Sequence, residues 1–152
     1  MADVFEAKKE IPAERLTLGE NSMSEQPVIL DIVGGPTITV AWIKNMNGQQ
    51  VMEAAYDDQQ PAGSLNYALQ YYGEALGYLV VMINETYDSY ISAAEPFFYW
   101  EFLINDIPAN KGIDNTIVSP GDRVTFRFER YIPEKHKGST LEAKFRAQTG
   151  RV

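Results

Sequence analysis

Two strand patterns that flank one long loop, between residues 97 and 131, constrain the fold of this chain most. Apolar side chains occupy every second position in both: Phe98, Trp100, Phe102 and Ile104 in the first, and Val124, Phe126 and Phe128 in the second. Alternate residues of an extended strand point to the same side of a sheet, so each set forms one apolar face. The second strand also carries polar residues on its other face, as expected of a half-solvated antiparallel strand. We therefore expect both strands to contribute to one aromatic core.

The segment between these strands, residues 105–118, is too long for a tight hairpin. It contains Pro108, Gly112 and Asn115, which are typical of irregular backbone, and we predict a shaped crossing loop. Loops of this kind often carry binding residues. Pro120 and Gly121 then predict a turn before the second strand, because proline fixes φ and glycine accepts a positive φ.

Upstream, Asn47-Gly48 separates two short runs at 37–44 and 50–56. Both residue types tolerate the positive φ of a type I′ turn, so the pattern predicts a β-hairpin. The apolar run at 27–33 predicts a short strand, placed at the edge of the sheet.

Downstream of the hairpin, Ser64 is a suitable N-cap for a helix over 65–76, in which apolar residues recur at helical spacing. Gly77 is placed to end this helix. The run at 79–84 is almost continuously apolar and predicts a central strand that is covered on both faces.

This order of elements predicts an α+β fold of the β-grasp type, a mixed sheet of four or five strands packed on one helix. We expect a polar N-terminal arm at 1–26, the β-grasp domain at 27–132 and a basic C-terminal tail at 133–152. In the tail, Ser139 and Glu142 form a capping-box pattern that predicts a short helix through Gln148. We expect the tail to be solvated or docked on another subunit.

Composition excludes several kinds of site. There is no cysteine, and His136 is the only histidine, so metal sites built on cysteine or on two imidazoles within one chain are not expected. Residues 1–132 carry 8 Lys/Arg and 19 Asp/Glu, and this acidic body argues against nucleic-acid binding. No run approaches the ~20 apolar residues of a membrane span. The first residues lack a signal-peptide pattern, so we expect a cytoplasmic or assembly-associated, for example virion-associated, protein.

Catalysis is not expected either. Acid–base chemistry would have to use pairs such as Asp57 with Asp58 or Asp106 with Asp114, and a serine triad would need His136 from the tail. The adjacent aspartates lie in a Gln/Pro/Gly-rich segment that is typical of a solvated turn. We therefore predict that the protein is not an enzyme.

The central stretch resembles a known family. The resemblance rests on Tyr99-Trp100-Glu101-Phe102-Leu103, Pro108, Gly112-Ile113, Pro120 and the strand from Val124 to Tyr131, with Gly77 to Asn84 and Ile38-Thr39-Val40 upstream. These motifs are similar to the C-terminal domain of the vitamin B12 carriers transcobalamin and intrinsic factor, and to an uncharacterised bacterial family like it. In those carriers this domain covers one face of the corrin, while a separate helical barrel, absent here, holds the other.

The resemblance implies a β-grasp of the soluble-ligand-binding type and a ligand surface in this region. The residues it carries across are Tyr99, Trp100, Leu103, Ile107, Pro108, Gly112 and Asn115, together with Glu101, which stands where the family has glutamine. Trp100 has a competing interpretation as a core anchor, because it shares its face with Phe98 and Phe102. Tyr99 and Glu101 lie on the opposite face and are the better candidates for ligand contact.

Two functional hypotheses follow. In the first, the chain is a non-catalytic module that binds a small molecule, such as cobalamin or another corrinoid, or a protein, through residues 97–118. In the second, it is a structural or adaptor subunit of a virion, filament or multi-subunit complex. Its terminal segments, 1–26 and 133–152, would then contact neighbouring subunits, as in a homo-oligomer.

Overall fold

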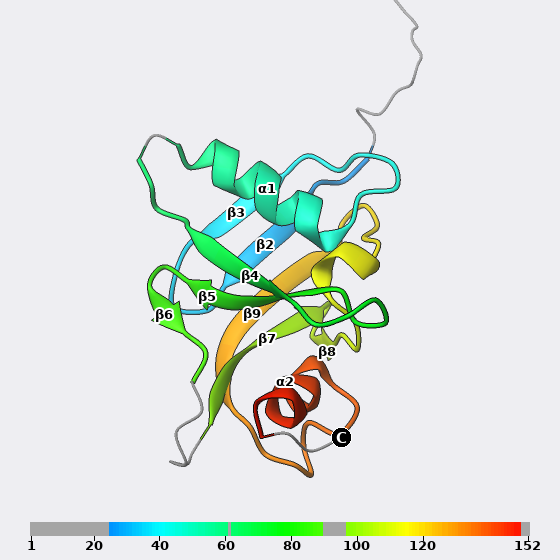
Figure 1. The fold of residues 1–152 in the computed structure, drawn as a ribbon. Coiled ribbons are helices and arrows are strands. Elements are labelled where there is room, and N and C mark those ends of the chain that lie inside the picture. Colours follow the sequence, from blue (N-terminus) through cyan, green and yellow to red (C-terminus); the bar gives the residue numbers. More distant parts are fainter. Residues whose placement is uncertain (1–24, 61, 90–96, 150–152) are drawn as a thin grey trace, which may run out of the picture.

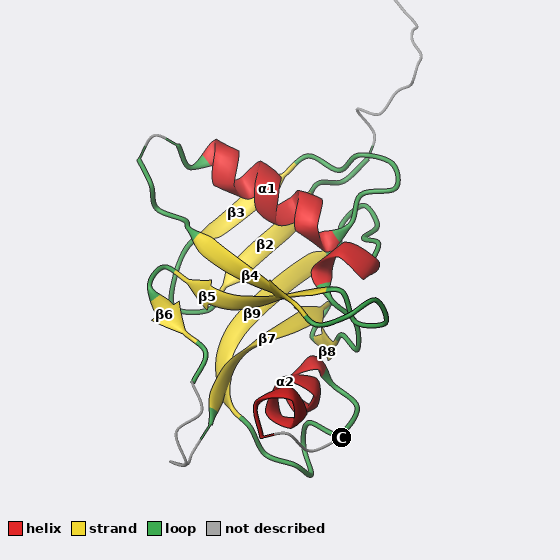
Figure 2. Cartoon of the chain, in the orientation of Figure 1, coloured by secondary structure: helices red, strands yellow, loops and turns green. Residues whose placement is uncertain are grey.

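The computed structural model describes residues 25–60, 62–89 and 97–149 (Figure 1). The N-terminal arm predicted at 1–26 lies almost wholly outside the described residues. In the described part of the chain, strands form a larger and a smaller sheet, and the helices flank them (Figure 2). The α+β class predicted from the sequence is confirmed.

The larger sheet has five strands in the order β3-β2-β9-β7-β8. They are β2 (Val28–Ile32), β3 (Thr37–Val40), β7 (Phe98–Ile104), β8 (Ile107–Pro108) and β9 (Arg123–Arg130). Strand β2 runs parallel to β9, and the other neighbours are antiparallel. A first hairpin followed by a helix, with the last strand inserted beside the first, is the β-grasp arrangement, so the predicted mixed sheet is confirmed.

A second layer covers one face of this sheet (Figure 1). It consists of helix α1 (Gly48–Asp58), the 3-10 turn η2 (Ile113–Asn115) and a three-stranded sheet of β4 (Tyr67–Tyr71), β5 (Tyr78–Ile83) and β6 (Thr86–Tyr87). The apolar core lies between the layers and includes Leu30, Val51, Met52, Val80, Trp100, Phe102 and Phe126. The predicted aromatic face of the strands around 100 and 126 therefore packs in this core.

Helix α2 (Thr140–Thr149) packs against β7. A second cluster joins Leu141 of α2 to Phe97 and Tyr99, with the rings of Tyr131 and Phe145 stacked 4.5 Å apart beside it. The sequence pattern predicted a solvated or subunit-docked tail here. Instead, the described part of the tail buries apolar side chains against its own domain.

The predicted hairpin over 37–56 is wrong, because Asn47 caps a helix rather than forming a turn. The Asn47 side chain accepts a hydrogen bond from Gln50 N (2.8 Å), and the Gln50 side chain accepts one from Asn47 N (2.9 Å). This reciprocal capping box starts α1 at Gly48. The hairpin of this region is formed instead by β2 and β3, which the Gly34-Gly35 turn connects.

The predicted helix over 65–76 is also wrong, since this segment forms β4 and the loop of the β4–β5 hairpin. Gly73 (φ +98°) and Gly77 (φ +89°) take backbone conformations that favour glycine, and Gly77 N donates to Gly73 O (2.7 Å). Both glycines therefore shape a hairpin loop. The strand predicted at 79–84 is confirmed as β5, the middle strand of the smaller sheet.

Two further expectations are corrected. The strand predicted at the sheet edge, β2, lies inside the sheet between β3 and β9. The loop predicted to be too long for a tight hairpin begins with one, since Asn105 and Asp106 take positive φ (51° and 68°) and turn β7 directly into β8. The turn at Pro120-Gly121, the strand that follows it and a helix from Thr140 are as predicted.

A close contact ties the 105–118 loop to the β4–β5 hairpin. Gly112 N donates to Leu76 O (2.7 Å), and Asn115 Nδ2 donates to the same oxygen (3.1 Å). Asp114 Oδ1 accepts from Tyr78 N (2.8 Å). A Cβ at Gly112 would overlap Tyr78 O and lie 2.7 Å from Leu76 O, so only glycine allows this approach.

We predict that Gly112→Ala lowers the free energy of unfolding by about 2 to 3 kcal/mol, because its methyl group must displace backbone rather than a flexible side chain. Urea denaturation would measure the loss. Gly73→Ala is the control: a Cβ there meets nothing within 4 Å, and only its positive φ is unfavourable, at about 1 kcal/mol. Equal losses in the two variants would contradict the close-packed contact.

Candidate functional site

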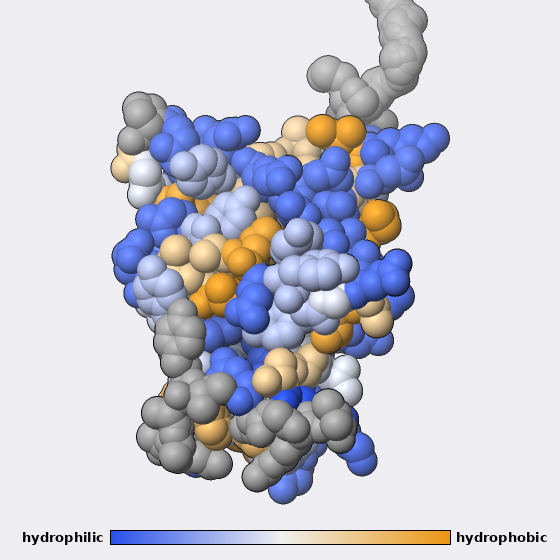
Figure 3. All heavy atoms as spheres, viewed as in Figure 1, coloured by the Kyte–Doolittle hydropathy of each residue, from blue (hydrophilic) through white to orange (hydrophobic). Residues whose placement is uncertain are grey.

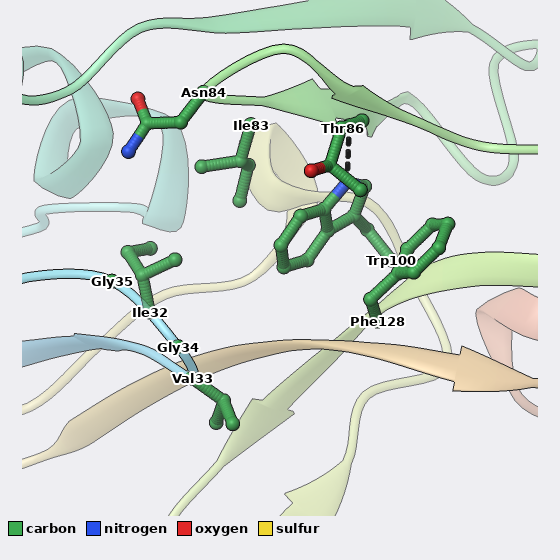
Figure 4. A pocket seen from close by; sticks show the side chains of 9 residues that line it. All are labelled: Ile32, Val33, Gly34, Gly35, Ile83, Asn84, Thr86, Trp100 and Phe128. Atoms are coloured by element: carbon green, nitrogen blue, oxygen red, sulfur yellow. Dashed lines mark hydrogen bonds between the residues drawn. The ribbon is translucent and has the colours of Figure 1, made fainter.

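A cavity of about 360 Å³ opens between the two sheets (Figure 4). Its walls come from the end of β2 and the following turn, from the β5–β6 turn and from the middle of β7 and β9. The lining residues are Ile32, Val33, Gly34, Gly35, Ile83, Asn84, Thr86, Trp100 and Phe128. In Figure 4, Ile83 and Ile32 approach the cavity from opposite sheets, and the Trp100 indole lies beside them.

Strand register brings the aromatic wall together. Trp100 and Phe128 are direct partners in the antiparallel pair of β7 and β9, and their ring centroids are 5.3 Å apart. Phe98 also stacks against Phe128, with ring centroids 5.7 Å apart. Of these three rings, those of Trp100 and Phe128 line the cavity.

Trp100 is held by one polar contact of its indole and one of its backbone. Its Nε1 donates to Thr86 O (2.8 Å), and its backbone N donates to Asp88 Oδ1 (2.8 Å). The side chain is only 5% exposed. Trp100 is therefore both a core anchor, the competing interpretation of the sequence, and part of the cavity wall.

Among the residues that the resemblance carries across, the structure places Trp100 alone in this lining. Tyr99, Glu101 and Leu103 are at most 2% exposed, on the other face of β7 from the core. Ile107 and Pro108 lie exposed in β8. Gly112 and Asn115 hold the β4–β5 hairpin as described above.

Sequence reasoning missed most of the lining. Two turns, at Gly34-Gly35 and at Asn84-Glu85, bring residues 32–35 and 83–86 to the cavity, and Asn84 and Glu85 both take positive φ (49° and 71°). The paired glycines after an apolar run were a usable signal for the first turn. Nothing local indicates that the two turns face one another, because they belong to different sheets.

A second cluster contains Glu101, Glu129 and His136, whose oxygen and nitrogen atoms lie within 4.8 Å of one another. His136 Nε2 is 4.0 Å from Glu101 Oε2 and 3.8 Å from Glu129 Oε1. Arg127 Nε contacts both carboxylates at 3.2 Å, and Lys135 Nζ contacts Glu129 at 3.2 Å.

This cluster is better suited to an internal ion network than to a metal ion. His136 Nδ1 accepts a hydrogen bond from Ile132 N (2.9 Å), so in the neutral imidazole Nε2 carries the proton. A metal ion needs the lone pair of Nε2, which this tautomer does not offer. Arg127 and Lys135 already balance the two carboxylate charges.

The acid and base candidates of the sequence lie in different surroundings. Asp57 and Asp58 are exposed at the end of α1, and Asp106 lies in the β7–β8 turn. Asp114 accepts a backbone hydrogen bond, and His136 is only 1% exposed.

Comparison with known families decides where the chain belongs. The profile of one family, described as a domain of unknown function (DUF4430), matches residues 48–130, more than half of the chain. The chain belongs to this family. No curated protein matches it.

Among solved structures, the domain is similar to haptocorrin in complex with Cbi, with a TM-score of 0.54 and 17% sequence identity. The match covers 75% of this chain but only 27% of haptocorrin. A protein of Ruminococcus gnavus ATCC 29149, provisionally named as metal-binding, matches with a TM-score of 0.42 and 13% identity over 71% of this chain and 98% of its own. The resemblance to cobalamin-carrier domains is thus confirmed at the level of the fold.

The described helices include none that is long and apolar enough to cross a membrane. Figure 3 shows the face that carries β4 and β5: polar residues cover most of it, and apolar residues form smaller groups over these strands. Scattered groups of this kind are normal on a solvated surface. The cavity between the sheets is the candidate site that we consider further.

We predict that Trp100→Phe lowers the free energy of unfolding by about 2 to 4 kcal/mol, because it opens a gap beside Phe128 and removes the indole donor to Thr86 O. Denaturant titration by circular dichroism would measure this. The matched control is Trp42→Phe: its Nε1 also donates to a backbone carbonyl (Val118 O, 3.1 Å), but the side chain is only partly buried, so we expect a smaller loss. A larger loss for Trp42→Phe would contradict the anchoring role of Trp100.

Proposed function

We propose that the domain is a non-catalytic binding module that holds one edge of a small molecule against Trp100 and Phe128, in the cavity between the sheets. The observation that carries the proposal is the cavity itself: an anchored aromatic wall beside two turns that supply backbone polar groups. Ligand sites commonly combine an apolar concave surface with a few fixed polar groups. Because Trp100 is already held in place, a ligand would not have to order it.

A corrinoid is the ligand class that the proposal names. It is supported by membership of the family and by the shared fold with haptocorrin, which was solved in complex with Cbi. A cavity of about 360 Å³ accommodates an edge of a large flat molecule rather than the whole of it. The proposal therefore assigns this domain one part of a shared site, in which a further domain or partner covers the remaining ligand surface.

The alternative, an assembly subunit tied to neighbours by its terminal segments, has less support. Of the proposed docking segments, the structure describes 25–26 and 133–149. In the second of these, Leu141 and Lys144 are at most 1% exposed. This face of α2 is therefore packed on its own domain and cannot also contact a neighbouring subunit. Light scattering of the purified chain, with and without residues 1–24, would test this alternative: a monomer in both forms would reject it.

Binding is tested by equilibrium dialysis of the chain against cobinamide and cobalamin, with the visible corrin band as the readout. We expect Thr86→Asp to weaken binding about tenfold or more, because a carboxylate in place of the Thr86 side chain must lose water when the ligand docks. Thr86 is exposed, and it is its backbone oxygen that accepts from Trp100, so this change should leave the fold intact.

Ile43→Asp is the matched control, since Ile43 is 64% exposed and does not line the cavity. It should leave corrinoid binding unchanged. Binding that is equally strong in both variants and the wild type would contradict the proposed site. Retention of neither corrinoid by the wild type would contradict the proposed ligand class.

A further inference from the structure

The ammonium group of Lys144, on α2, lies in the interior at a junction of three oxygen atoms. Its Nζ lies 2.6 Å from Val80 O, 2.9 Å from Trp100 O and 3.0 Å from Asp88 Oδ2. Lys144 is 1% exposed and Asp88 is 5% exposed. A lysine and a carboxylate so deeply buried are unusual, because both charged forms lose their hydration.

The three contacts differ in kind. Val80 O and Trp100 O accept hydrogen bonds from Nζ, and carbonyl oxygens can only accept. Asp88 Oδ2, although 3.0 Å from Nζ, has no aligned hydrogen-bond partner among the described residues. A neutral amine has two N–H groups and one lone pair. With both N–H groups directed at carbonyls, the lone pair is free to face the Asp88 carboxyl group.

The carboxyl group of Asp88 is also oriented. Its Oδ1 accepts a hydrogen bond from Trp100 N at 2.8 Å, which leaves Oδ2 on the side of Lys144. A backbone N–H directed at one carboxyl oxygen stabilises negative charge that develops there when the carbon is attacked. The site therefore places a nucleophile, a carboxyl carbon and an oxyanion donor side by side.

Burial favours the neutral forms of both groups. Loss of hydration raises the pKa of Asp88, against the opposing effects of the Lys144 charge and the Trp100 N–H. It lowers the pKa of Lys144, again opposed by Asp88. One proton shift from the ammonium to the carboxylate converts the ion pair into a free amine beside a carboxylic acid, the pair of groups that can condense to an amide.

We propose that Lys144 and Asp88 condense to form an intramolecular isopeptide bond that fastens α2 to the segment after β6. The Nζ lone pair attacks Cγ of the protonated Asp88 carboxyl, and the charge that develops on Oδ1 is stabilised by Trp100 N–H. One Nζ proton passes to Oδ2, the Cγ–Oδ2 bond breaks, and one molecule of water leaves. An N–C bond replaces a C–O bond, nothing is oxidised or reduced, and no co-reactant is needed.

The bond would serve as a covalent staple in a chain without cysteine. It would link residues 88 and 144, which are far apart in the sequence, and so restrict the unfolded chain as a disulfide does. Unlike a disulfide, it would persist under reducing conditions. It would also fix the position of α2 against β7 irrespective of whether the cavity binds a ligand.

The test is the intact mass of the full wild-type chain, measured under denaturing conditions directly after purification and again after prolonged incubation at neutral pH. We expect a mass lower than that of the sequence by one water molecule. Proteolysis should yield one branched peptide that contains both Asp88 and Lys144, which distinguishes the bond from dehydration elsewhere. An unaltered mass at both times, with two separate linear peptides, would overturn the proposal and leave the pair as an ion pair.

Variants locate the chemistry. Asp88→Ala and Lys144→Arg should each retain the full mass, because neither can form the amide. Lys137→Arg, which changes an exposed lysine of the same segment, should still lose one water. If Asp88→Ala or Lys144→Arg does not fold, the peptide map of the wild-type chain alone shows whether the amide bond has formed. Because this test does not involve a ligand, its failure leaves the proposed binding function untouched, and the reverse also holds.

Discussion

The position of Trp100 is the constraint on which the rest of the structure depends. Its indole N–H reaches Thr86 O, its backbone N–H reaches Asp88, and its carbonyl accepts from Lys144. One residue in the middle of β7 thus connects the larger sheet to the end of the smaller sheet and to α2. Burying these polar groups is tolerable only because each has a partner, so the three elements must be in place together.

The same junction forms part of the cavity wall. The apolar core and the hydrogen bond from the indole to Thr86 O join the two sheets, and the cavity lies between the β2–β3 turn and the β5–β6 turn. The aromatic wall of Trp100 and Phe128 is set by strand register rather than by a flexible loop. The aromatic part of the cavity wall thus lies on strands, whereas the two turns complete the lining.

The elements predicted correctly are those whose local sequence pattern fits only one kind of secondary structure. Strands β5, β7 and β9 and the turn at Pro120-Gly121 follow from alternation and turn chemistry, and the β-grasp class follows from their order. The hairpin predicted from Asn47-Gly48 is wrong because asparagine is favourable both in a type I′ turn and as the N-cap of a helix. What decides between the two is contact with a distant segment, since Gly48 packs against Ile113 and Phe102. The same holds for residues 65–76, where helical spacing of apolar residues coincides with a strand and a glycine-shaped loop.

The candidate site was less predictable than the fold. Trp100 was named as a candidate because it lies in the motif that carries the family resemblance, but the turns that complete the cavity meet only through sheet packing. Tyr99 and Glu101 were expected to be accessible from strand parity alone. The alternation of residues along a strand correctly predicts the face on which each side chain lies. It does not predict what packs on that face, and here α2 covers Tyr99.

Hydrogen exchange of the two indole N–H groups, followed by NMR, tests the central role of Trp100 most directly. If Trp100 joins both sheets and α2, its indole proton exchanges only when these elements separate, and should do so much more slowly than the proton of the partly buried Trp42. Exchange of the Trp100 indole proton as fast as that of Trp42 would mean that this junction opens locally. The anchored wall on which the account rests would then be contradicted.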